Sequence, residues 1–239
     1  MASKYKRVLL KLSGEAIAGN KGFGIDPAIT GQVADDIAEV YQDGVEIAIV
    51  IGAGNFIRGA TAEGVSRVAG DTMGMLGTVI NSIAIKEYLE AREIPARVLT
   101  AVHCDRAGEY FTPDLAIEYM KMGIVVVIAG GTGNPFFTTD TAAALRSAEI
   151  GADVVLKATK VDGVYDSDPA KNPNAVRFEM LTHAEALARE LKVMDATAFS
   201  FCQEYGVDII VFKLLEKGNL RKCIQGQPVG TTVTSGGKQ

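Results

Sequence analysis

Runs rich in valine and isoleucine alternate with helical patterns along the chain, and this alternation restricts the fold more than any other feature. The runs expected to form strands are Val8–Leu12, Val45–Ile51, Ala96–Val102, Ile124–Ala129, Asp153–Ala158 and Val207–Phe212. Several are apolar at successive positions, as are parallel strands that are buried on both faces. The alternation predicts an α/β fold, a three-layer αβα sandwich with a mainly parallel central sheet.

Helix signals stand between these runs. Asp26 and Thr112 each come directly before a proline, which predicts an N-cap followed by proline in the first turn. Thr182 and Glu185 have the spacing of a capping box. The mostly apolar segment Thr78–Ala91 predicts a long, buried helix.

Composition sets aside several classes of protein. The 239 residues contain no repeat and suit one domain, residues 1–239. A net charge of −5 argues against binding nucleic acid by bulk charge, although a single nucleotide needs only a few cations. The three scattered cysteines favour neither zinc nor disulfides and suit the cytoplasm. The longest purely apolar run, Ile124–Ala129, is too short to cross a membrane, and no signal-peptide pattern is recognised at the start.

Glycines collect directly after three of the expected strands, in Ser13–Gly14, Gly52–Gly54 and Gly130–Gly133. The carboxyl ends of parallel strands share one edge of a sheet, and glycine lets backbone N–H groups approach an anion closely there. A tight turn explains any one of these loops, but three together favour a site for phosphate groups. A P-loop string is absent, and Ile57 occupies the third glycine position of a dinucleotide motif, which disfavours a Rossmann dehydrogenase.

Charged side chains stand beside these loops. Lys11 lies near the end of an apolar strand, where an ammonium is costly unless it meets an anion or reaches solvent. Arg58 suits bidentate contact with phosphate and is equally compatible with a solvated surface. Asp71 and Asp140 each stand at an expected helix start, where they could simply cap it. Alternatively, Asp71 would accept hydrogen bonds from the hydroxyl groups of a sugar or another ligand, and Asp140 would hold lysines in place.

The segment Gly130–Thr141 combines backbone donors, threonine hydroxyls and two adjacent phenylalanines. Such a pair is unusual in an exposed loop unless one packs on a ring-shaped ligand or fixes the loop. Asp162–Gly163 predicts a hairpin turn. The two histidines, His103 and His183, are expected at the surface or at helix caps. Cations, backbone donors and one organising carboxylate without a nucleophile suit phosphoryl transfer, with Mg²⁺ bridging the donor phosphates.

Four segments resemble the amino acid kinase family. Val161–Tyr165, followed by Asp168, is similar to a feature shared across that family. Gly130–Asp140 (GGTGNPFFTTD), Gly70–Leu76 (GDTMGML) and Leu191–Asp195 (LKVMD) resemble its bacterial branch that phosphorylates UMP. The resemblance covers nearly the whole chain. It implies ATP-dependent phosphorylation of UMP to UDP in pyrimidine nucleotide biosynthesis, by direct in-line transfer.

The resemblance also implies a role for individual positions. Those that would bind ATP are Lys11, Leu12, Ser13, Gly14, Gly54, Arg58, Thr159, Tyr165 and Asp168. Those that would bind UMP are Ala53, Asp71, Thr132, Gly133, Asn134, Pro135, Phe136, Phe137, Thr138 and Thr139. The catalytic residues would be Lys11, Asp140 and Lys157, with Lys192 a weaker candidate for the second cation. The part before about residue 150 would hold UMP, and the remainder ATP.

Further properties are implied in the same way. They are Mg²⁺ bound with ATP, a cytoplasmic homohexamer, activation by GTP and inhibition by UTP. The segment similar to the one tied to the GTP response consists of Gly19, Asn20, Lys21, Gly22, Phe23 and Gly24. The chain departs from its relatives at Ala53, where they commonly carry glycine; a methyl group disfavours positive φ, so a small effect on the UMP contact is expected.

Two other functions are compatible with the residues. One is a kinase of this fold that acts on a small carboxylate or carbamate, although such an acceptor needs neither a ring platform at Phe136–Phe137 nor a ribose acceptor at Asp71. The other is a non-catalytic nucleotide sensor, which would bind nucleotides without releasing ADP in the presence of UMP.

Overall fold

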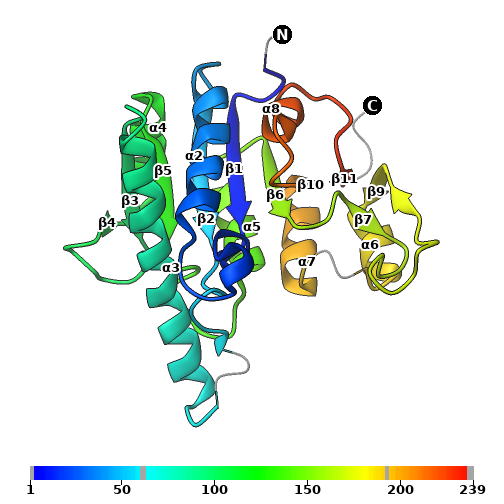
Figure 1. Cartoon of the computed structure of the whole chain (residues 1–239), viewed down its shortest axis with the longest axis horizontal. Helices are drawn as coiled ribbons and strands as arrows, with labels where there is room; N and C mark the ends of the chain where they lie inside the picture. The colour runs from blue at the N-terminus through cyan, green and yellow to red at the C-terminus, as the bar shows by residue number, and fades with distance from the viewer. Residues whose placement is uncertain (1–2, 60–62, 192–193, 236–239) are drawn as a thin grey trace.

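A nine-stranded sheet forms the centre of the protein (Figure 1). The computed structural model describes residues 3–59, 63–191 and 194–235. The strands of the sheet are β1 (Arg7–Leu12), β2 (Glu46–Ile51), β3 (Ala96–Thr100), β4 (Glu109–Tyr110), β5 (Val125–Ala129), β6 (Val154–Thr159), β9 (Met180–Thr182), β10 (Asp208–Lys213) and β11 (Thr231–Thr234). Their order is β4-β3-β5-β2-β1-β6-β10-β11-β9, and among these neighbours β10 and β11 make the antiparallel pair.

Helices cover both faces of this sheet. They are α1 (Gly14–Ile17), α2 (Pro27–Tyr41), α3 (Arg67–Glu90), α4 (Pro113–Lys121), α5 (Thr139–Glu149), α6 (His183–Ala188), α7 (Ala196–Tyr205) and α8 (Asn219–Ile224), with a 3-10 turn over Gly19–Lys21. α3 and α8 contact the sheet on one side, and α2 packs against these two helices. α4 and α5 contact the other side, and α7 packs against α5. Each face has its own hydrophobic core. The predicted three-layer sandwich is therefore confirmed.

The predicted helix starts follow from local chemistry. The Asp26 side chain accepts hydrogen bonds from the backbone N–H groups of Ala28 and Ile29, and Thr112 does the same for Leu115. The capping box of Thr182 and Glu185 is also formed. These caps satisfy N–H groups that have no partner within the helix.

α3 differs from the expected helix Thr78–Ala91 both in its start and in its burial. The Ser66 side chain caps it, so Asp71 lies inside the helix and does not cap it. One face packs on β3 and β5, while Val68, Met73, Leu76, Ile80 and Ile83 stay at least 40% exposed. Within the described residues α3 is the helix long and apolar enough to cross a membrane, a test that the core helix of a globular protein also passes.

Two local predictions are wrong. Asp162–Gly163 does not close a hairpin, because β7 (Val164–Tyr165) pairs across a longer loop with β8 (Arg177–Phe178). His183 lies neither at the surface nor at a helix cap; it is fully buried, and its Nε2 lies 3.0 Å from the backbone oxygen of Val207. Burial lowers the pKa of this imidazole below its ordinary value, so the neutral ring is favoured.

Asp36 on α2 makes stability depend on pH. Its burial, together with the charges of Glu39 and Asp35 and against that of Lys217, raises its pKa from 3.8 to about 6. Since folding raises this pKa, the stabilising contribution of the protonated carboxyl is complete below about pH 3.8 and is lost as the pH rises through about 6. We expect Asp36→Asn to raise the melting temperature by about 5 °C at pH 8 and much less at pH 5. Thermal denaturation at both pH values measures this, and an equal shift at each would contradict it.

Candidate active site

Two lysines stand side by side on the sheet. In the parallel pair of β1 and β6, Lys11 is the direct partner of Lys157. Leu9 on β1 and Val155 on β6 face the core beneath α5, while their immediate neighbours face the opposite core. Because side chains alternate along a strand, both lysines face the α5 side as well.

Asp140 joins these lysines. Thr138 caps α5 and places Asp140 in its first turn. The Asp140 carboxylate lies 2.8 Å from Lys11 Nζ through Oδ1 and 2.7 Å from Lys157 Nζ through Oδ2. We call Lys11, Asp140 and Lys157 the cation cluster. All three side chains are largely buried, and together they carry a net positive charge suited to binding an anion.

The charges in this cluster depend on one another. Burial by itself raises the pKa of the Asp140 carboxyl, but the charges and hydrogen bonds of Lys11 and Lys157 outweigh it and hold that pKa below its usual value. Burial lowers the pKa of Lys157, and repulsion from Lys11 acts in the same direction against the attraction of Asp140. The carboxylate therefore keeps two close ammonium groups together.

Asp195 fixes the start of α5. Its carboxylate accepts hydrogen bonds from the hydroxyl of Thr138 and, at 3.0 and 3.1 Å, from that of Thr141. It also caps α7 through the backbone N–H of Ala198. α5, and with it Asp140, is thereby tied to α7. Asp195 is the last residue of the LKVMD segment, but nothing in the sequence around it indicates this role.

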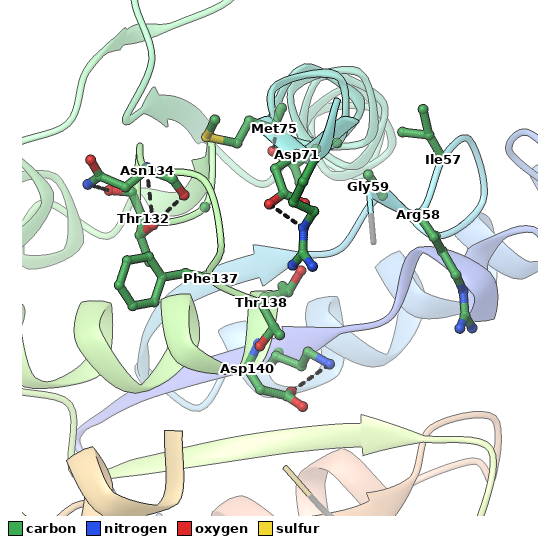
Figure 2. Close-up of a pocket in the computed structure, with 18 residues that line it drawn as sticks. Ile57, Arg58, Gly59, Asp71, Met75, Thr132, Asn134, Phe137, Thr138 and Asp140 are labelled. Carbon is green, nitrogen blue, oxygen red and sulfur yellow. Dashed lines mark hydrogen bonds and ion pairs between the residues drawn. The ribbon is translucent and has the colours of Figure 1, made fainter. Parts of the chain in front are cut away.

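A cavity of about 420 Å³ opens beside the cation cluster (Figure 2). The site residues predicted from the sequence that line this cavity are Lys11, Ala53, Gly54, Arg58, Asp71, Thr132, Asn134, Phe137, Thr138, Thr139 and Asp140. They come from the carboxyl end of β1, from the segments after β2 and β5, and from the N-terminal parts of α3 and α5. The end of β1 and the loops after β2 and β5 therefore meet at one edge of the sheet. Of the three predicted glycine loops, those after β2 and β5 line the cavity, while Gly14 packs against Gly52 and Gly54 beside it.

The cavity also has lining residues that sequence reasoning missed. They are Ile57, Gly59, Arg67, Gly74, Met75 and Thr78, whereas Gly131 belongs to the predicted glycine loop. Arg67 Nε lies 2.7 Å from Asp71 Oδ2, and the same oxygen accepts the backbone N–H of Phe136 at 2.8 Å. The four-residue spacing of Arg67 and Asp71 could have indicated this pair, but Asp71 was expected at the start of the helix, which left Arg67 outside it.

The electrostatics at Asp71 favour an ionised carboxylate. Partial burial alone raises the pKa of Asp71, but the Phe136 N–H and the Arg67 guanidinium outweigh this and lower it. Phe136 itself has a φ of +72°, a conformation that L-residues rarely adopt and that the bond to Asp71 helps to hold. The carboxylate thus ties the phenylalanine loop to α3.

Other predicted residues lie beside or away from the cavity. The Leu12 side chain is fully buried, so its backbone alone faces the edge of the sheet. The residues that flank the cavity are Ser13, Gly14, Gly133, Pro135 and Phe136. Lys192 lies outside the described residues.

The residues expected to meet the ATP nucleoside do not line this cavity. The Thr159 hydroxyl donates to the backbone oxygen of Val161 at 2.6 Å, and the Tyr165 hydroxyl donates to Asp162 Oδ1 at 2.6 Å. Asp168 is exposed. A second hollow, of about 380 Å³, lies between the β7–β8 hairpin and α8, and its lining contains none of the predicted residues.

Ala53 fits its loop without strain. In the described chain, the residues other than glycine with positive φ are Glu93, Phe136 and Glu190, so Ala53 does not adopt the conformation that favours glycine. Its methyl group occupies the space beside Gly77 on α3, where an added Cβ would come within 2.8 Å of it. The expected disturbance at Ala53 is therefore small, because α3 leaves room for the methyl group.

The residues near the cavity do not form a metal-binding set. Within the part of the chain that the structure describes, no group of three or more His, Cys, Asp or Glu side chains could hold a metal ion. The carboxylates of Asp140 and Asp195 are already engaged by lysines and threonines. These side chains therefore do not fit a metal held by the protein alone.

Comparisons with known proteins agree with this geometry. Residues 6–213 match the model of the amino acid kinase family. The chain is similar to the crystal structure of UMP kinase from Bacillus anthracis, with 34% identity, a TM-score of 0.94 and coverage of 98% of this chain and 97% of that one. For UMP kinase from Ureaplasma parvum the identity is 34%, the TM-score 0.90 and the coverage 97% and 99%. Uridylate kinase from Archaeoglobus fulgidus is more distant, with 26% identity, a TM-score of 0.74 and coverage of 95% and 99%.

Proposed function

Because this chain belongs to the amino acid kinase family, we propose that it transfers the γ-phosphoryl group of ATP to UMP and so produces UDP. The observation that carries the proposal is the cation cluster at the side of a cavity lined by Lys11 at the end of β1 and by the loops after β2 and β5. The full-length similarity to two UMP kinases supports this acceptor over a small carboxylate. The reaction belongs to pyrimidine nucleotide biosynthesis.

The cavity suits the acceptor. The ionised carboxylate of Asp71, which Arg67 holds in place, would accept hydrogen bonds from the ribose hydroxyls. The hydroxyl-bearing loop from Thr132 to Thr139 would surround the base, with Phe137 against its ring. The UMP phosphate would then lie at the end nearer the cation cluster, close to Gly54 and Arg58, which would contact the ATP phosphates.

The transfer needs positioning and charge neutralisation more than proton chemistry. An oxygen of the ionised UMP phosphate attacks the γ-phosphorus of ATP in line; the new P–O bond forms as the bond to the leaving ADP oxygen breaks. No proton has to be removed from the acceptor. Lys11 and Lys157 would stabilise the charge on the transferring group, and Asp140 would hold both lysines in place.

We also propose that Mg²⁺ arrives with ATP, coordinated by the nucleotide's own phosphates. Bound in this way it would neutralise charge on the donor phosphates. This fits the side chains around the cavity, whose carboxylates are engaged by other residues.

Assembly, regulation and location are further parts of this proposal. The exposed apolar residues of α3 favour contact with a second copy of the chain, and a homohexamer is the expected form. Gly24 is hydrogen bonded to Asn55 in the loop after β2, which supports a role of Gly19–Gly24 in activation by GTP. Inhibition by UTP is expected as well. Three free cysteines suit the cytoplasm. Sedimentation and titration of GTP and UTP against turnover test the first two points.

Acceptor specificity tests the proposed function directly. With ATP and Mg²⁺, we expect ADP release in the presence of UMP and little with CMP or AMP, because the chain is similar over nearly its full length to two UMP kinases. A coupled assay with each nucleoside monophosphate measures this. Phosphorylation of CMP or AMP with UMP ignored, or UMP binding without ADP release, would refute the proposal.

A further inference from the structure

Thr78 and Asn81 lie about one turn apart on α3, and each is bonded to a loop from a different strand. The Thr78 hydroxyl oxygen accepts the backbone N–H of Gly130 at 2.8 Å and donates to the backbone oxygen of Met75 at 2.6 Å. Asn81 Nδ2 donates to the backbone oxygen of Gly52 at 2.7 Å. Gly52 directly follows β2, and Gly130 directly follows β5.

The Asn81 amide is part of a fully satisfied buried pair. Asn81 Nδ2 donates to Asn55 Oδ1 at 2.8 Å, and Asn55 Nδ2 donates back to Asn81 Oδ1 at 2.9 Å. The second donor of Asn55 reaches the backbone oxygen of Gly24 at 2.9 Å. Both side chains are at most 1% exposed. Amides buried this deeply must be paired, so the pair holds a single arrangement.

The two loops held in this way carry the residues expected to meet the substrates. The loop after β2 contains Ala53 and Gly54, and the loop after β5 leads into the hydroxyl-bearing segment from Thr132. β2 and β5 are neighbours in the sheet, but their loops leave it in different directions around the cavity. α3 is the rigid element bonded to both.

We propose that Thr78 and Asn81 are positioning residues for phosphoryl transfer. Through them α3 sets the placement of the loop after β5 relative to the loop after β2, so that the acceptor phosphate meets the donor. The inference rests on the proposed kinase function. Thr78 holds the loop after β5, which is expected to contact UMP, through Gly130. Asn81 holds the loop after β2, which lies beside the cation cluster, through Gly52. Misplacement by about 1 Å costs up to about a hundredfold in rate.

Four variants test this inference. Thr78→Val removes the acceptor for the Gly130 N–H but keeps the shape, and Thr78→Ser restores the hydroxyl. Asn81→Ala removes the bond to the Gly52 oxygen. Ser82→Ala is the control, because Ser82 is equally buried on α3 but its hydroxyl donates only to the backbone of Thr78 within the same helix.

We expect Thr78→Val to raise KM for UMP about tenfold while KM for ATP stays within about twofold, with Thr78→Ser close to the original enzyme. Asn81→Ala should raise KM for both nucleotides about tenfold. Hydrogen exchange at the Gly130 amide should accelerate in Thr78→Val and not in Ser82→Ala. Unchanged KM values and exchange in Thr78→Val, or equal effects in Ser82→Ala, would overturn the inference.

The unmodified enzyme separates failure of this inference from failure of the proposed function. If it forms no UDP from UMP, the proposed function fails, and the inference is then decided by UMP affinity in calorimetry and by Gly130 exchange in Thr78→Val. If Asn81→Ala does not fold, the comparison of Thr78→Val with Thr78→Ser decides alone.

Discussion

Replacing Asp140 by asparagine is expected to lower kcat for UMP phosphorylation by about 10²- to 10³-fold. The neutral amide offers one oxygen where the carboxylate binds both Lys11 and Lys157. Its NH₂ group would face an ammonium, which is itself a donor. Repulsion from Lys11 would then lower the pKa of Lys157 further, since Asp140 is the main charge that opposes this shift, ahead of Asp195. Steady-state kinetics with ATP and UMP measures the loss.

The same substitution should reduce stability. Removing one partner of a buried charge cluster costs about 3–5 kcal/mol, because the remaining charges lose their compensation. Asp43→Asn is the matched control, since Asp43 pairs with Arg221 at 2.8 Å between the end of α2 and α8, outside the cavity. The control should keep its kcat. If Asp140→Asn retains the fold and turns over as fast as the control, Asp140 does not organise the reaction.

The second large effect is expected for Lys11→Met. This substitution should lower kcat about a thousandfold and change KM for UMP little. Lys11 would meet charge that develops on the transferring group, so its loss weakens the transition state more than the bound acceptor. Methionine retains most of the apolar stem, and Asp140 keeps Lys157 as its partner at 2.7 Å. Rapid-quench and steady-state kinetics together measure the step that slows.

The control for this variant is Lys86→Met. Lys86 lies on α3, away from the cavity, and pairs with Glu90 at 2.5 Å. It should turn over normally. A Lys11→Met enzyme with nearly normal kcat and raised KM for ATP would assign Lys11 to ground-state binding of the donor and contradict its role in transfer.

The layers of the fold could be predicted because their signals are local. Alternating apolar runs, proline after an N-cap and a capping box depend on neighbouring residues alone. α3 shows the limit of this reasoning. Its apolar pattern indicated a helix, but which of its residues are buried depends on which face meets the sheet. The start of the helix at Ser66 was not predicted because the apolar pattern is stronger further along the chain.

The site could be predicted only where loops follow strand ends. Lys11 and the Gly130–Thr141 segment were marked by their position at the carboxyl ends of strands. The pairing of Lys11 with Lys157 depends on β1 lying next to β6, which is a matter of sheet order. Contacts such as Thr78 with Gly130 join residues 52 positions apart, and no local spacing signals them.

A crystal structure with UMP and a non-hydrolysable ATP analogue tests the central claim most directly. We predict a γ-phosphate oxygen within about 3 Å of Lys11 Nζ, with the UMP phosphate beside Gly54 and its ribose on Asp71. A γ-phosphate bound away from Lys11 and Lys157, or UMP bound outside the cavity between α3 and the loop after β5, would contradict it.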